Sequence, residues 1–70
     1  MKLQNLIHQL RYENSAVGEV TREIESDNMY TSFKDESKLK EYMSKKMLQK
    51  GMISGFSELL MVHELINSRV

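Results

Sequence analysis

The chain has 70 residues, with ten lysines and arginines balanced by ten aspartates and glutamates, so its formal net charge at pH 7 is zero. This length predicts one domain, residues 1–70, whose core is too small to enclose the cavity of about 300 Å³ or more that a small-molecule substrate commonly needs. Zero net charge gives no bulk attraction to nucleic acid or to an anionic membrane. The lack of cysteine excludes disulfides and thiolate chemistry.

Membrane and targeting segments are not indicated by the sequence. No apolar run approaches the roughly 18 residues that span a bilayer, and residues 1–8 are too polar for the apolar part of a signal peptide. We therefore expect a cytoplasmic protein with no membrane partner, no small-molecule substrate and no cofactor.

The first half of the chain predicts two amphipathic helices. The first spans residues 2–11, where the apolar residues recur at three- and four-residue intervals: Leu3, Leu6, Ile7 and Leu10. The second ends near Ser26, and Asn14 or Ser15 can cap its first turn by accepting a hydrogen bond from a free amide. Gly18 costs this helix about 1 kcal/mol relative to alanine. It either permits close helix packing or is simply tolerated.

The segment 27–33 between the second and third helices is too apolar for a free loop and too irregular for a helix. We expect Tyr30 and Phe33 to be partly buried there and to hold the segment against the core. Asp35 is a suitable N-cap for a third helix that ends near Gln49 or Lys50, and Gly51 can adopt the left-handed conformation that terminates it.

The last predicted helix begins between Met52 and Ser57 and runs to about Ser68. One broad face is apolar and contains Phe56, Leu59, Leu60, His63 and Ile66. Met61 and Leu65 point nearly the opposite way, with Val62 on the flank. Two alternatives remain open: Met61 and Leu65 pack under the N-terminal helix, or they form a contact with a partner.

Several segments resemble the YozE SAM-like family. Residues 17–27 resemble its "I-G-D-L-A-x-D-I-x-x-D" helix, residues 39–43 resemble its "I-x-x-Y-L" helix, and residues 56–66 resemble its amphipathic last helix. The resemblance implies an all-α fold, a small four- or five-helix SAM-like bundle. It also implies a small protein of low-GC Gram-positive bacteria or their phages, without established enzymatic activity and without site residues to carry over.

Catalytic and metal-binding chemistry is not indicated. His8 and His63 have no carboxylate at three or four residues along their helices, so we expect a surface histidine and a hydrogen-bonded structural histidine. Glu19 pairs with Glu23, and Glu23 with Asp27, at i, i+4 spacing, but solvated carboxylates on a helix exterior lack the pocket that acid–base catalysis requires. We predict that the protein is not an enzyme and holds no metal.

Charges are unevenly distributed along the chain. Residues 13–27 are predominantly acidic and residues 34–50 are rich in lysine. These are either two helix faces that attract each other within the monomer, or patches that meet partners. The lysines, together with nearby aromatics, support an alternative function as a weak nucleic-acid-binding protein, whose possible contacts are Lys34, Lys38, Lys45 and Lys46.

The function we expect is that of a small non-enzymatic protein-interaction module. It would be a bacterial or phage accessory protein or inhibitor that binds a host protein or self-associates. The predicted partner-binding residues are Met61, Val62 and Leu65, with the charged patches steering the approach.

Overall fold

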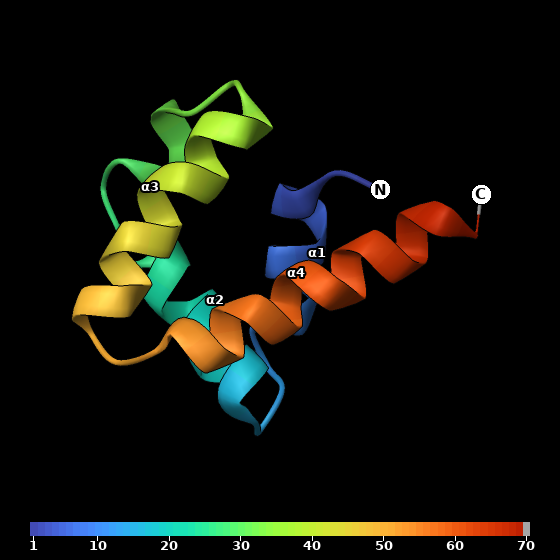
Figure 1. Ribbon diagram of the computed structural model, residues 1–70, viewed down its shortest axis with the longest axis horizontal. Helices are drawn as coiled ribbons and strands as arrows, with labels where there is room; N and C mark the ends of the chain where they lie inside the picture. The colour runs from blue at the N-terminus through green and yellow to red at the C-terminus, as the bar shows by residue number, and fades with distance from the viewer. Residues whose placement is uncertain (70) are drawn as a thin grey trace.

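The computed structural model describes residues 1–69, which contain four α-helices, one 3₁₀ turn and no strand (Figure 1). The elements are α1 (Leu3–Leu10), α2 (Ala16–Glu25), η1 (Tyr30–Ser32), α3 (Glu36–Gln49) and α4 (Ile53–Ser68). The predicted small all-α bundle is confirmed, with four helices. In this part of the chain, no helix combines the length and the apolar character needed to cross a bilayer.

Three helix boundaries follow from the residues that flank them. The Ser15 side chain accepts a hydrogen bond from the Gly18 amide at the start of α2, and the Asp35 side chain accepts one from the Ser37 amide, 2.9 Å away, at the start of α3. Gly51 has a φ of 72°, the left-handed conformation predicted for the end of α3. The start of α4 has no side-chain cap, which explains why the sequence left its first residue open.

The core gathers one apolar stripe from each helix together with the segment between α2 and α3. Tyr30 is only 9% exposed, and its hydroxyl donates a hydrogen bond to the Gln4 carbonyl of α1. Phe33 is half-buried, with its ring centroid 5.1 Å from that of Tyr42 on α3. The predicted partial burial of both aromatics is confirmed. The fully buried apolar residues are Leu3, Ile7, Val20, Ile24, Leu39, Met43, Met47, Phe56 and Leu59.

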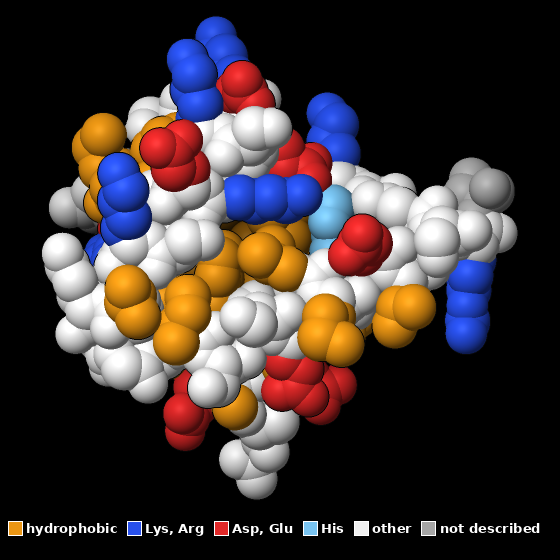
Figure 2. All heavy atoms as spheres, viewed as in Figure 1, with side chains coloured by type: hydrophobic (Ala, Val, Ile, Leu, Met, Phe, Trp, Pro, Cys, Tyr) orange, Lys and Arg blue, Asp and Glu red, His pale blue; other side chains and the backbone are white. Residues whose placement is uncertain are grey.

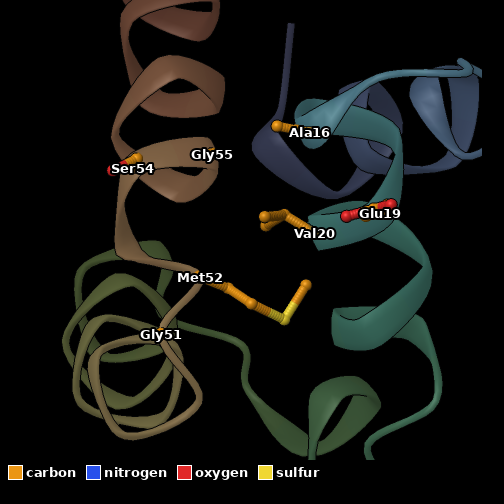
Figure 3. A pocket seen from close by; sticks show the side chains of 7 residues that line it. All are labelled: Ala16, Glu19, Val20, Gly51, Met52, Ser54 and Gly55. Carbon is orange, nitrogen blue, oxygen red and sulfur yellow. The ribbon is translucent and has the colours of Figure 1, made fainter.

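The contact between α2 and α4 depends on a glycine. A Cβ atom on Gly55 would lie 2.7 Å from Val20 Cγ2 and 2.9 Å from the Ala16 carbonyl oxygen. Figure 3 shows Gly55 facing α2, with the side chains of Val20 and Met52 between the two helices. The missing side chain therefore lets the first turn of α4 approach the backbone of α2.

Gly18 performs a similar role in the turn between α1 and α2. A Cβ atom there would lie 1.9 Å from the Glu13 carbonyl oxygen, which is too close for any side chain. Arg22 Nη1 donates to the carbonyl oxygens of Arg11 at 2.7 Å and Glu13 at 3.1 Å and so holds the same turn. Gly18 is therefore required and not simply tolerated, but the close contact that it permits is with the preceding turn and not with another helix.

Candidate interaction surface

Helix α4 is buried on one side and carries two exposed apolar side chains on the other. Phe56, Leu59 and His63 are at most 4% exposed, whereas Met61 is 62% exposed and Leu65 is 60% exposed. Met61 and Leu65 therefore do not pack under α1. Residues at i and i+4 lie on one face of a helix, so the two side chains form one continuous apolar surface.

The C-terminal half of α4 extends beyond the other helices (Figure 1). A shallow groove of about 180 Å³ on it is lined by Met61, Glu64, Leu65 and Ser68. Apolar side chains are visible along the edge of α4 in Figure 2. Val62, which we predicted to belong to this surface, is half-buried and packs against the core. Met61 and Leu65 thus make up the accessible part of the predicted partner-binding set.

A polar cluster around Asp27 joins the segment after α2 to α3. The Asp27 carboxylate accepts hydrogen bonds from the Lys46 ammonium and, at 2.9 Å, from the Tyr42 hydroxyl. The Met29 amide donates to the other carboxylate oxygen at 2.7 Å. These hydrogen bonds, with that from Lys46 the largest influence, lower the pKa of Asp27 from 3.8 to about 2. Hydrogen bonding to Asp27 likewise raises the pKa of Lys46 and of Tyr42.

The acidic and lysine-rich segments pair with each other within the chain. Besides the contact between Asp27 and Lys46, Glu23 Oε1 lies 2.5 Å from Lys50 Nζ, an interaction that lowers the pKa of Glu23. Both pairs link the acidic α2 region to α3. Opposite helix faces that attract each other in the monomer, one of the two alternatives from the sequence, therefore account for part of the uneven charge.

The four lysines proposed for nucleic-acid contact do not form one basic surface. Lys46 is held by Asp27, and Lys45 Nζ lies 3.9 Å from Glu41. Lys34 and Lys38 are exposed. Lysine and carboxylate side chains alternate over the visible face of α3 (Figure 2). This mixture dilutes the positive potential that a phosphate backbone requires.

His63 lies in a polar notch between α3 and α4. The carbonyl oxygen of Met1 lies 2.9 Å from its Nε2, and because a carbonyl can only accept, Nε2 donates this hydrogen bond. A Glu36 oxygen lies 3.6 Å from the same nitrogen. The sequence did predict a hydrogen-bonded His63, but neither of these partners, since both come from other elements. The hydrogen bond shows that the His63 ring has a structural role, because it ties α4 to the main chain of Met1.

His8 is exposed, as predicted, although Nδ1 lies 3.5 Å from a Glu25 oxygen on α2. Across residues 1–69, no group of three histidine, aspartate or glutamate side chains converges in the way that a metal ion requires.

The sequence carries a signal for the Asp27 cluster. Tyr42 and Lys46 are four residues apart and share one face of α3, so a single carboxylate can reach both. The predicted solvated position of Asp27 is wrong, because its side chain is only 5% exposed.

Comparison of the chain with protein-family models, with curated proteins and with solved structures finds no match.

Proposed function

We propose that the protein is a small, cytoplasmic, non-enzymatic interaction module that binds a protein through the exposed side of α4. The observation that carries this proposal is the exposure of Met61 and Leu65, at 62% and 60%, on a helix whose other side is buried. Scattered apolar side chains are common on protein surfaces, but an adjacent pair that forms a groove wall is a better candidate for a contact. The resemblance to small bacterial and phage proteins supports an accessory or inhibitory role.

The polar clusters at Asp27 and His63 support this proposal, because both stabilise the fold and so offer no competing functional site. Asp27 joins the segment after α2 to α3, and His63 joins α4 to the main chain of Met1. Nucleic-acid binding by Lys34, Lys38 and Lys45 remains the alternative. It is weakened by the neighbouring carboxylates and by the loss of Lys46 to Asp27.

Site-specific photo-crosslinking tests the proposal. A photoreactive residue is placed at Met61 and, as a matched control, at Leu48, which is 65% exposed on α3. The proposal expects one defined protein to be captured from position 61, in stoichiometric amounts, and not from position 48. The same capture should disappear when Leu65→Glu is added. Equal capture from both positions, or capture that ignores Leu65→Glu, would refute the proposed surface.

A further inference from the structure

The exposed apolar pair on α4 has a charged residue of opposite sign at each end. Glu58 lies three residues before Met61, and Arg69 lies four residues after Leu65. Both are exposed, and neither makes an ion pair with any residue in the described range 1–69. Arg69 is the residue directly after α4 and keeps a right-handed helical backbone conformation. At about 100° per residue, Glu58 and Arg69 therefore project from the same flank of the apolar pair.

We propose that the partner of this surface is a second copy of the chain, with the exposed sides of the two α4 helices packed antiparallel around a two-fold axis that crosses them at the level of His63. This inference rests on the proposed function, because it uses the same side chains. Antiparallel pairing places Met61 of one copy opposite Leu65 of the other. The apolar contact is therefore complementary to itself, as a two-fold interface requires.

The positions of the charges fit this arrangement. With a rise of about 1.5 Å per residue, Glu58 lies about 7.5 Å to one side of the level of His63, and Arg69 lies about 9 Å to the other side. The two-fold axis brings Glu58 of one copy to nearly the same level as Arg69 of the other, on the same flank. The dimer therefore contains two opposite-charge contacts. A parallel pair would instead place Glu58 beside Glu58 and Arg69 beside Arg69, so that like charges face each other.

The rest of the exposed face permits close approach. Ser57 and Ser68 lie beside the stripe within the paired length, and small side chains allow helix axes to come together. Glu64 lies further round the helix, on the opposite flank, where it approaches Glu64 of the other copy. Its charge opposes association, so removing that charge should strengthen the dimer.

The apolar area is small, which sets the strength that we expect. Stable dimers bury about 800 Å² per partner, and two exposed apolar side chains supply only part of that. The chain should therefore exist as monomer and dimer in a concentration-dependent equilibrium. Sedimentation equilibrium over a wide concentration range measures this directly, and the expected result is a mean mass that rises from one chain toward two.

Variants separate this dimer from other kinds of association. Leu65→Glu should abolish the rise in mass, whereas Leu48→Glu, the same change on exposed α3, should not. Glu58→Arg and Arg69→Glu should each weaken self-association roughly three- to tenfold, since each contact occurs twice and exposed ion pairs contribute little individually. An equimolar mixture of the two variants should form a heterodimer with restored affinity, because the opposite charges again face each other.

The outcomes also separate this inference from the proposed function. A wild-type chain that stays monomeric at every concentration overturns the inference, as does a mixture of the charge variants that fails to restore association. If that monomeric chain is still crosslinked from position 61 to a different protein, and Leu65→Glu abolishes the crosslink, the proposed function stands alone. If position 61 captures nothing as well, both are wrong.

Discussion

Asp27 and Lys46 lie 19 residues apart in the chain, and their side chains meet where the segment after α2 packs against α3. The Asp27 side chain is 5% exposed and that of Lys46 is 24% exposed, so the pair is largely shielded from solvent. Tyr42 adds a hydroxyl donor from the previous turn of α3. One carboxylate thus fixes the irregular segment against two consecutive turns of a helix.

The Asp27 contact predicts a specific acid dependence of stability. Because folding lowers the pKa of Asp27 from 3.8 to about 2, its contribution is complete above about pH 4 and is lost as the pH falls toward about 2. Asp27→Asn should lower the free energy of unfolding at neutral pH, and the difference from wild type should shrink over that range. Urea denaturation at several pH values measures this. Glu19→Gln, at an exposed position of α2, is the control, and a constant difference for Asp27→Asn would contradict the prediction.

Two leucines on α4 should respond in opposite ways to truncation. Leu59 is fully buried, so Leu59→Ala should cost about 2–5 kcal/mol of unfolding free energy. Leu65 is 60% exposed, so Leu65→Ala should change it by less than about 0.5 kcal/mol. Denaturant titration monitored by circular dichroism at low protein concentration compares them. A large loss in Leu65→Ala under these conditions would mean that this side chain belongs to the core.

Gly55→Ala should destabilise the protein although alanine is the better helix former. The new methyl group would overlap Val20 and the Ala16 carbonyl, and overpacking of this kind costs about 1–3 kcal/mol. Ser54→Ala, one residue earlier and exposed, is the matched control and should be neutral or slightly stabilising. Adding Val20→Ala to Gly55→Ala should recover part of the loss. Thermal melts that show equal stability for both alanine variants would refute the close approach of α2 and α4.

The two aromatics of the segment between α2 and α3 should differ in their contributions. Tyr30 is 9% exposed, and Tyr30→Ala should cost about 3–5 kcal/mol, enough to unfold much of a domain of this size. Phe33 is only half-buried, so Phe33→Ala should cost less. Melting temperatures of the two variants rank these costs. An unchanged melting curve for Phe33→Ala would show that its contact with Tyr42 contributes nothing to stability.

Nucleic-acid binding should be weak and sensitive to salt. We expect dissociation constants no tighter than the range of about 10⁻⁴ to 10⁻⁶ M that is typical of non-specific binding at physiological salt. Fluorescence anisotropy with single- and double-stranded oligonucleotides measures the affinity. Sub-micromolar binding that falls on Lys38→Gln would favour the alternative function over the α4 surface.

The sequence correctly predicted the helix ends that depend on neighbouring residues. Ser15, Asp35 and Gly51 act within one helical turn, and the structure places all three at the helix ends expected from the sequence. Contacts between distant elements were harder to foresee. The carbonyl that holds His63 comes from Met1, 62 residues away, and no periodic pattern encodes that pairing.

The exposed side of α4 illustrates the same limit. Helical periodicity placed Met61 and Leu65 opposite the buried face, but it could not decide whether another helix covers them. That depends on the path of α1, which packs against α2 and leaves the side of α4 that carries Met61 and Leu65 uncovered. The prediction that Val62 belongs to the exposed side is wrong, because Val62 lies on the flank of α4, where a small rotation of the helix decides burial.

The close approach at Gly55 has a consequence for the order in which the chain folds. Helices α1 and α2 pack against each other, as do α3 and α4, and the members of each pair are neighbours in sequence. The contact between α2 and α4 is instead made by helices that are separated along the chain. Loop-closure entropy must be overcome before such non-local contacts contribute. We therefore expect the two helix pairs to form first, and the contact of Gly55 with Val20 to form last, when the pairs join.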